Sequence, residues 1–274
     1  MNTDTHTTWF LTGASRGFGR LWAEAALRRG DRVVATARDV GTLDDLAATY
    51  GDAFLPLPLD VTDRDAVFDT VRRAAEHFGR IDVVVNNAGY GHFGAVEELT
   101  ESDIRAQLET NFFGALWVLQ ATLPVLRAQG SGHLLTVTSE GGVRAFPGIG
   151  AYHASKWAVE GLVQSLVQEI EGSGIRVTNI EPGPYETGWL EIGARRSAPL
   201  PAYEHLRSDP VAFEIGDPAA TVPALFAVVD ADDPPLRVFF GRSFEPVREQ
   251  YLAQLAEWER WQDVALAAFG TAGR

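Results

Sequence analysis

The sequence predicts an α/β fold in which a parallel sheet carries helices on both of its faces. Two observations along the 274 residues support this prediction. Short apolar strand-like runs alternate with amphipathic stretches of helical period, which is the pattern of repeated β-α units. No linker, repeat or low-complexity stretch interrupts this alternation. We therefore expect residues 1–274 to form a single domain.

Seven strands and four long helical stretches can be assigned from the pattern. The expected strands are Thr8–Leu11, Arg32–Ala37, Ala53–Leu59, Ile81–Val85, His133–Thr138, Ile175–Ile180 and Leu236–Phe240. The expected helices are Arg20–Arg29, Ala66–Phe78, Ser102–Gln129 with a break near Phe112, and Ala151–Glu171. Several strands are apolar throughout, as expected of strands that helices cover on both sides.

Two segments fall outside this alternation. Residues 184–216 follow the sixth strand and are rich in proline, glycine and aromatic residues without a clear period. Because long aperiodic loops are uncommon in compact domains, we expect this segment to be a lid that closes over a ligand. Residues 244–269 form a helical tail. We expect its aromatic residues Tyr251, Trp258 and Trp261 to pack in the core or at a subunit contact.

The composition disfavours several classes of protein. The chain has no cysteine, which excludes disulfides, thiolate catalysis and cysteine-based zinc sites. Its six histidines never fall at metal-ligand spacing, so no metal site is predicted. A net charge of −14 disfavours binding to nucleic acid and to anionic membranes. The start of the chain, Met1–His6, does not resemble a signal peptide, and no apolar run is long enough to span a bilayer, so we expect a cytoplasmic protein.

A glycine-rich turn, Thr12–Gly19, joins the first strand to the first helix. Glycines at such a corner let the backbone turn tightly and approach a pyrophosphate at the helix N-terminus. The turn lacks the Gly-Lys-Ser/Thr ending of a P-loop, which disfavours ATP or GTP hydrolysis. With the β-α alternation, it predicts a doubly wound Rossmann sheet of strand order 3-2-1-4-5-6-7. The turn residues expected to bind a dinucleotide are Gly13, Ser15, Arg16, Gly17, Phe18 and Gly19.

Two arginines occur where the adenosine ribose of a dinucleotide would lie. Arg16 is part of the glycine-rich turn, and Arg38 directly follows the second strand. In nucleotide-binding sheets an acidic residue at this point binds the ribose 2′-hydroxyl of NAD, whereas an arginine accommodates the 2′-phosphate of NADP. The expected cofactor is therefore NADP(H). Asp39 follows, and we expect it to be solvated or to cap the next helix.

Tyr152 and Lys156 form the candidate catalytic pair. Four residues apart at the start of a helix, they lie on one face, and Lys156 is the only lysine among 23 basic residues. An arginine cannot reproduce its compact ammonium. A nearby ammonium favours tyrosinate, which predicts a lowered pKa of Tyr152 and a phenol able to exchange a proton with an alcohol or ketone oxygen. Ser139, after the fifth strand, could hydrogen-bond the same oxygen.

These residues resemble the short-chain dehydrogenases/reductases over essentially the whole chain. The matching motifs are Thr12–Gly19, Asp60-Val61, Asn86-Asn87-Ala88-Gly89, Asn111, Ser139, Tyr152 with Lys156, and Pro182-Gly183 followed by Thr187. Within this family, Asn86–Gly91 and Glu181–Pro184 are most similar to the subgroup of 17β-hydroxysteroid and retinol dehydrogenase-like proteins.

The resemblance implies a role for each motif. Asp60 and Val61 would hold the adenine, and Lys156 would bind the nicotinamide ribose. Asn111 would fix a water that links Lys156 to a proton relay, and Thr187 would contact the carboxamide. Members commonly form homodimers or homotetramers through the two long helices. The remaining residues that the resemblance assigns to the cofactor cleft are Asn87, Ala88, Gly89, Tyr152, Pro182 and Gly183.

The substrate side is expected to be a largely apolar pocket for a bulky ketone, aldehyde or alcohol. Its expected lining residues are Phe93, Glu140, Phe146, Tyr185 and Trp189, with Tyr203 and Phe213 as further aromatic residues of the lid. Glu140 and Glu186 depart from the family pattern, which has a small residue after the serine and often an arginine or apolar residue in the later loop. We expect Glu140 to face solvent, or alternatively to add one polar contact at the pocket rim.

Three functions are compatible with these residues. The favoured one is reversible, NADP(H)-dependent hydride transfer between a ketone or aldehyde and an alcohol. An epimerase or dehydratase uses the same Ser-Tyr-Lys set, but such relatives usually have a shorter glycine spacing and a larger C-terminal domain. A non-catalytic NADP-binding sensor or scaffold is the third, and such proteins often lack the tyrosine or lysine that this chain retains.

Overall fold

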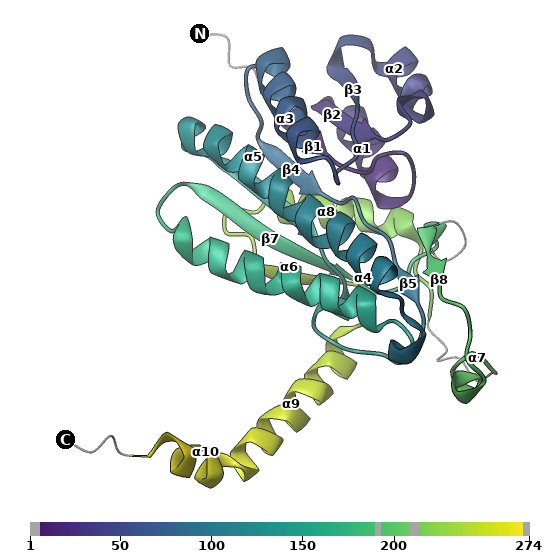
Figure 1. The fold of residues 1–274 in the computed structure, drawn as a ribbon. Helices are drawn as coiled ribbons and strands as arrows, with labels where there is room; N and C mark the ends of the chain where they lie inside the picture. The colour runs from purple at the N-terminus through teal and green to yellow at the C-terminus, as the bar shows by residue number, and fades with distance from the viewer. Residues whose placement is uncertain (1–5, 190–192, 209–213, 271–274) are drawn as a thin grey trace.

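The computed structural model describes residues 6–189, 193–208 and 214–270 (Figure 1). Its main sheet has seven parallel strands in the order β3-β2-β1-β4-β6-β7-β9. These are β1 (Thr8–Leu11), β2 (Arg32–Ala37), β3 (Phe54–Pro58), β4 (Val83–Asn86), β6 (Gly132–Val137), β7 (Ile175–Pro182) and β9 (Arg237–Phe240). Two short strands, β5 (His92–Phe93) and β8 (Arg195–Arg196), pair separately. The main sheet therefore confirms the predicted single-domain Rossmann order 3-2-1-4-5-6-7.

Helices cover both faces of this sheet, as the doubly wound prediction requires (Figure 1). One face carries α1 (Gly17–Arg28), α2 (Asp44–Tyr50) and α8 (Thr221–Val229), and the other carries α3 (Arg64–Phe78), α5 (Gly114–Gln129) and α6 (Gly150–Glu169). Side chains alternate between the faces along β1. Trp9 and Leu11 belong to the same buried cluster as Trp22 of α1, whereas Phe10 belongs to the cluster with Val118 of α5.

The long helical stretch predicted for 102–129 is interrupted at the predicted place. It consists of α4 (Glu101–Leu108), a π-helical turn at Glu109–Phe113, and α5. A π-helical turn adds a residue to one helical turn without ending the helix, and such turns often occur at functional sites. Asn111 lies within this turn and is buried. The remaining described α-helices are α7 (His205–Ser208), α9 (Phe244–Arg260) and α10 (Gln262–Phe269).

The C-terminal helices α9 and α10 extend away from the sheet (Figure 1). Trp258 is 60% exposed and Trp261 is 59% exposed, so the expectation that the tail aromatics pack in the core is wrong. Their predicted place at a subunit contact stays a prediction. Within the described ranges, no helix combines the length and the apolar character needed to cross a membrane.

Candidate active site

A cavity of about 1110 Å³ opens at the carboxyl ends of the parallel strands. Its walls come from the segments that follow β1, β2, β4 and β6 and from the end of β7, which is where ligands bind in sheets of this kind. The cavity brings together all the site residues predicted from the sequence except Gly19 and Asn111. Residues from six separate motifs therefore converge on one site.

The glycine-rich turn packs directly against the segment after β4. Gly13 has a positive φ of 72°, and a Cβ there would lie 2.9 Å from the Cα of Ala88. The Asn87 amide nitrogen donates to the carbonyl oxygens of Thr12 (2.9 Å) and Gly13 (3.1 Å). A Cβ at Gly19 would overlap the carbonyl of Gly13. Gly19 is thus needed for packing within the turn rather than for contact with the cavity.

The start of α1 provides a place for an anionic group. Helix α1 begins at Gly17 beside the cavity, and within the described part of the chain its N-cap residue Arg16 makes no side-chain capping hydrogen bond. Backbone N–H groups at a helix N-terminus are a favourable site for phosphate. Arg16 and the exposed Arg38 both line the cavity near this end. The site therefore fits the pyrophosphate and phosphate groups of a dinucleotide.

Asp39, the neighbour of Arg38, behaves as predicted. It is exposed, and its carboxylate accepts a hydrogen bond of 3.1 Å from the backbone N–H of Gly41 at the start of a short 3-10 helix. The Asp39 carboxylate is therefore engaged in this cap, and Arg38 is the residue of the pair that lines the cavity. Asp60 is similarly occupied, because its Oδ1 accepts from both the N–H (3.0 Å) and the hydroxyl (2.8 Å) of Thr62.

Ser139, Tyr152 and Lys156 meet at the inner end of the cavity. Ser139 Oγ accepts from the N–H of Gly141 at 3.0 Å, and it interacts with the phenol of Tyr152. The Lys156 Nζ donates to the carbonyl of Val137 at 2.8 Å and lies 5.9 Å from the centre of the Tyr152 ring. All three side chains line the same cavity as the glycine-rich turn.

The pKa of Tyr152 differs from the sequence-based expectation. Burial raises the pKa of Tyr152 to about 12, the hydrogen bond with Ser139 lowers it, and the charge of Glu140 raises it further. Burial also lowers the pKa of Lys156 to about 8, although Glu160 opposes this. The expected lowering by Lys156 is therefore wrong for this structure. The pKa of Tyr152 stays high because both groups are desolvated and because the ammonium lies 5.9 Å from the centre of the ring.

Asn111 lies behind the cavity wall and supports it. Its Oδ1 accepts from the N–H of Tyr90 (3.1 Å), and its Nδ2 donates to the carbonyl of Tyr90 (2.9 Å) and to Ser155 Oγ (3.0 Å). A Cβ at Gly89 would lie 3.2 Å from Asn111 Oδ1 and 3.5 Å from Lys156 Nζ. Asn111 Oδ1 and Lys156 Nζ therefore approach the same side of Gly89 and lie near each other.

Comparison with known proteins assigns the chain to a family. The family profile described as short chain dehydrogenase matches residues 7–194. The oxidoreductase BOA17 of Botryotinia fuckeliana is 38% identical over 273 residues, which cover 95% of this chain and 98% of that protein. The chain belongs to the short-chain dehydrogenases.

Solved structures agree with this assignment. A short-chain dehydrogenase from Streptomyces avermitilis superposes with a TM-score of 0.89 at 37% identity, covering 96% of this chain and 99% of that one. An alcohol dehydrogenase from the archaeon Thermococcus sibiricus, complexed with 5-hydroxy-NADP, gives a TM-score of 0.73 at 29% identity. The alignment with this alcohol dehydrogenase covers 86% of this chain and 96% of that one. The general activity of this short-chain dehydrogenase is thus oxidoreduction with a nicotinamide cofactor.

Aromatic residues form the remaining wall of the cavity in this short-chain dehydrogenase. The Trp189 ring lies edge-on to Tyr152, with centroids 5.2 Å apart, and 5.9 Å from Phe93. Tyr185 packs against Phe18 of the glycine-rich turn at 5.2 Å. Phe146 borders the cavity 5.4 Å from the ring of His153. Phe93, Phe146, Tyr185 and Trp189 therefore border the cavity that Tyr152 also lines. Tyr203 of the predicted lid is not among the residues that line it and bonds instead to Glu97, and Phe213 lies outside the described residues.

Glu140 is buried, so the expectation that it faces solvent is wrong. The residue is 7% exposed, borders the cavity, and accepts a hydrogen bond from the hydroxyl of Ser243. Ser243 lies about a hundred positions later in the chain and directly precedes α9. No local pattern could have paired two residues so far apart, which is why the sequence predicted a solvated side chain.

His153 is a site residue that the sequence did not reveal. Its Nε2 accepts from the N–H of Phe146 at 2.8 Å, so Nδ1 carries the proton and donates to the carbonyl of Gly141 at 2.8 Å. Burial lowers the pKa of His153, which favours this neutral form. His153 therefore joins both ends of the loop between Ser139 and Phe146. Its only sequence signal was its position next to Tyr152.

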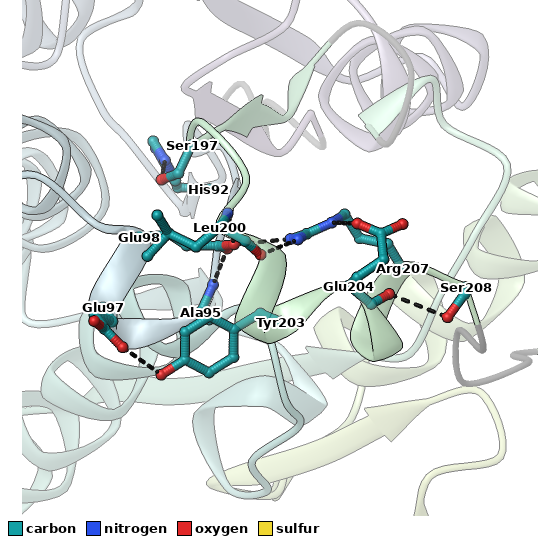
Figure 2. Close-up of polar contacts among 10 residues, drawn as sticks. All are labelled: His92, Ala95, Glu97, Glu98, Ser197, Leu200, Tyr203, Glu204, Arg207 and Ser208. Atoms are coloured by element: carbon teal, nitrogen blue, oxygen red, sulfur yellow. Dashed lines mark hydrogen bonds and ion pairs between the residues drawn. The ribbon is translucent and has the colours of Figure 1, made fainter.

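The predicted lid contains a segment that is bound to residues 92–98 (Figure 2). The segment 193–208 pairs through β8 with β5, and Ser197 Oγ hydrogen-bonds His92 at 2.9 Å. Glu98 Oε1 accepts from the N–H of Leu200 (2.7 Å) and from Arg207 (2.9 Å), while Oε2 accepts from the N–H of Ala95 (2.8 Å). One carboxylate therefore holds two points of the segment to residues 95–98.

Proposed function

We propose that this short-chain dehydrogenase is an NADP(H)-dependent enzyme that interconverts a bulky, largely apolar ketone or aldehyde with the corresponding alcohol. The observation that carries the proposal is the position of Ser139, Tyr152 and Lys156 in the same cavity as the glycine-rich turn. A proton-transfer group and a dinucleotide cradle are then close enough to act on one substrate carbon.

In this proposal Tyr152 moves the proton and its neighbours position it. The phenol donates to the carbonyl oxygen of the substrate during reduction and accepts from the alcohol during oxidation. Ser139 would hold the same oxygen, since its side chain lines the cavity together with that of Tyr152. Lys156 binds the nicotinamide ribose, and Asn111 positions the water that supplies Lys156. The bound nicotinamide supplies or accepts the hydride.

Preference for NADPH rests on two arginines and on the lack of an acid at the end of β2. Arg16 and Arg38 both border the end of the cavity where the adenosine ribose would lie. Asp60 and Val61 form the adenine side, and the 29% identical alcohol dehydrogenase contains an NADP derivative. The two arginines and the NADP derivative in that relative both support a 2′-phosphate site in this chain.

The aromatic wall indicates a substrate with apolar bulk next to the reacting carbon. Phe93, Phe146, Tyr185 and Trp189 supply this wall, and Glu140 adds one carboxylate. We further propose that residues 184–216 close over the bound substrate and exclude water.

Exposed Phe113 and Trp157 on the long helices support a homodimer or homotetramer through that face. The resemblance to 17β-hydroxysteroid and retinol dehydrogenase-like proteins and the cytoplasmic location stay predictions.

The deciding experiment is a panel of ketones, aldehydes and alcohols with NADPH and NADP⁺, followed at the absorbance of the reduced nicotinamide. We expect turnover of bulky apolar substrates and little turnover of small charged ones. NADPH titration by protein fluorescence provides the control, since a non-catalytic sensor would bind the cofactor without turning over any substrate. Epimerase or dehydratase chemistry would instead change a substrate without net change in the reduced nicotinamide.

The lid can be tested by limited proteolysis of 184–216 with and without NADPH and substrate. Closure predicts slower cleavage when both are bound. Identical cleavage in both conditions would contradict the lid and leave the catalytic proposal untouched.

A further inference from the structure

The tail helices α9 and α10 carry an apolar surface that is open to solvent in the described structure. Eight large side chains are 43–89% exposed, and we call them the tail surface: Tyr251, Leu252, Leu255, Trp258, Trp261, Val264, Leu266 and Phe269. Among the described residues that line the cavity of the candidate active site, none belongs to the tail surface. Figure 1 shows both helices extending away from the sheet.

The tail surface continues a face of α9 that begins against the body of the protein. Val247, Tyr251, Leu255 and Trp258 recur at spacings of three or four residues, which places them on one side of the helix. Val247, at the base, is only 7% exposed, and Gln250 donates to the carbonyl of Val143. Beyond these contacts the same side of the helix is uncovered. The base of α9 is therefore fixed, while its outer apolar side is open to a partner.

We propose that the tail surface binds the tail surface of a second copy of this chain across a two-fold axis. Exposed apolar patches larger than a few hundred Å² generally mark interaction sites. Aromatic side chains bury about 150–250 Å² each when enclosed, so four of them with four aliphatic neighbours provide several hundred Å² per copy. A stable interface needs about 800 Å² per partner. The tail surface is thus of the right scale for a dimer contact.

The charges of the tail favour a second copy over a membrane. Residues 244–269 contain five acidic residues, two arginines and no lysine. Helices that lie on membranes usually carry many lysines and arginines on the polar side, and anionic lipids repel an acidic segment. Glu249 and Arg260 lie roughly half a turn around α9 from Trp258 and Leu255, so they stay in water when the apolar sides meet.

Two-fold symmetry also places opposite charges together at the edge of the contact. Arg248 and Glu259 flank the same side of the apolar stripe, near opposite ends of α9. In an antiparallel pair of tails, Arg248 approaches Glu259 of the partner subunit, and the symmetry repeats this contact. The surface is therefore self-complementary in both apolar pattern and charge.

The first test measures mass by sedimentation for the full chain and for Leu255→Glu and Trp258→Glu. The matched control is Ala253→Glu, which puts the same charge on the opposite side of α9. We expect the parent and the control to be dimers or multiples of dimers, and the two tail-surface variants to have at most half that mass. NADPH binding should be equal in all four proteins, which shows that the variants are folded.

Other outcomes would overturn the proposal. A parent that is monomeric at about 100 µM, variants that keep the parent's mass, or a control that dissociates as far as Trp258→Glu would each do so. Binding of a monomeric parent to phosphatidylcholine vesicles would assign the surface to lipid instead. Because the contact is apolar and both tails are acidic, raising the salt concentration should strengthen the dimer; dissociation by salt would contradict it.

A second test uses the absence of cysteine in the chain. Single cysteines at Leu255→Cys and Trp258→Cys lie on the tail surface, and Ala253→Cys lies opposite. Across a two-fold axis, one position of the stripe approaches its own copy closely enough for a disulfide. We expect mild oxidation to cross-link Leu255→Cys, which lies near the midpoint between Arg248 and Glu259, and to leave Trp258→Cys and Ala253→Cys single. Equal cross-linking at all three positions would overturn the two-fold contact.

Discussion

The carboxylate of Glu140 accepts a hydrogen bond from the hydroxyl of Ser243, which links the residue after Ser139 to the start of α9. Both residues are buried, at 7% and 3% exposure. Glu140 also raises the pKa of Tyr152. One side chain therefore connects the base of the C-terminal tail to the electrostatics of the proposed proton donor.

Replacing Glu140 by glutamine is expected to lower the pKa of Tyr152, because the variant removes a nearby negative charge and keeps an acceptor for Ser243. In the direction of alcohol oxidation the rate rises as Tyr152 loses its proton. The rise should therefore occur at lower pH in Glu140→Gln, as measured by the pH profile of kcat/KM. Glu186→Gln is the control, since Glu186 is exposed and does not line the cavity. A profile that shifts equally in both variants would contradict this role.

Tyr152→Phe is expected to reduce kcat by about 10²–10⁴-fold, the usual contribution of a positioned acid or base. Cofactor affinity should change little, because the phenol oxygen is the only group removed. Lys156→Arg should also fail, since a planar guanidinium cannot replace the ammonium that donates to Val137 from a buried position. Steady-state kinetics with NADPH titration separates the two effects. Near-native kcat in Tyr152→Phe would show that another group transfers the proton, and near-native kcat in Lys156→Arg would show that the reaction does not need the ammonium.

Removing Arg38 is expected to weaken NADPH binding by about tenfold and to leave NADH binding nearly unchanged. A hydrogen bond to a charged group contributes about 1.5–3 kcal/mol, and the exposure of Arg38 reduces this. Ala37→Asp with Arg38→Ala should reverse the preference towards NADH. Titration of both cofactors against the parent and Arg73→Ala, an exposed arginine on α3, provides the comparison. Equal affinities of the parent for the two cofactors would refute the NADP assignment.

The sequence was sufficient for features that depend on local pattern. Strands β1 and β2 have the predicted bounds, and the glycine-rich turn lies where its spacing placed it. Helix α8 was missed because its residues are almost all apolar, so it shows no helical period. The short strands β5 and β8 were missed because each has two residues and their pairing joins distant segments.

The site was less predictable where it depends on long-range contacts. The partner of Glu140 is about a hundred residues away, and the burial that raises the pKa of Tyr152 depends on walls from several elements. Motif spacing indicates which residues meet, but it contains no information on how far each is desolvated. The tail was unpredictable for a different reason. Aromatic residues in a helix predict burial, but they do not specify which surface covers them.

Glu181 is expected to make the stability of the protein depend on pH. Burial, and then the charge of Glu160, raise the pKa of Glu181 from 4.5 to about 8, while Arg237 opposes them. The folded state therefore holds a proton that the unfolded state releases. This stabilisation is fully present below pH 4.5 and is lost as the pH rises through 8.

Glu181→Gln removes this titration while keeping the shape of the side chain. Between the pKa of the unfolded carboxyl and that of the folded one, the variant should gain stability relative to the parent by about 1.4 kcal/mol for each unit of pH. Urea unfolding at pH 5.5 and pH 8.5 measures the difference, with Glu169→Gln, an exposed glutamate of α6, as the control. A constant difference between variant and parent at both pH values would show that Glu181 is ionised in the folded protein.

Glu98 is expected to hold the segment 193–208 in place, and its neighbour Glu97 provides a matched comparison (Figure 2). Glu98 is buried and bonds to Leu200, Arg207 and Ala95, whereas Glu97 is exposed and bonds only to the hydroxyl of Tyr203 among the contacts drawn. Glu98→Ala leaves the N–H groups of Ala95 and Leu200 without their acceptor and removes one of the acceptors of Arg207, but Glu97→Ala removes one exposed bond.

The consequence can be measured with trypsin, which cleaves after arginine, because the segment contains Arg195, Arg196 and Arg207. Cleavage within the segment depends on how often it opens, and opening becomes easier when its anchors are lost. Glu98→Ala should therefore be cut there several-fold faster than the parent, and Glu97→Ala should resemble the parent. If both variants are cut at the parent's rate, the strand pair β5–β8 holds the segment without help from Glu98. If both are cut faster to the same extent, the exposed bond to Tyr203 matters as much as the buried carboxylate.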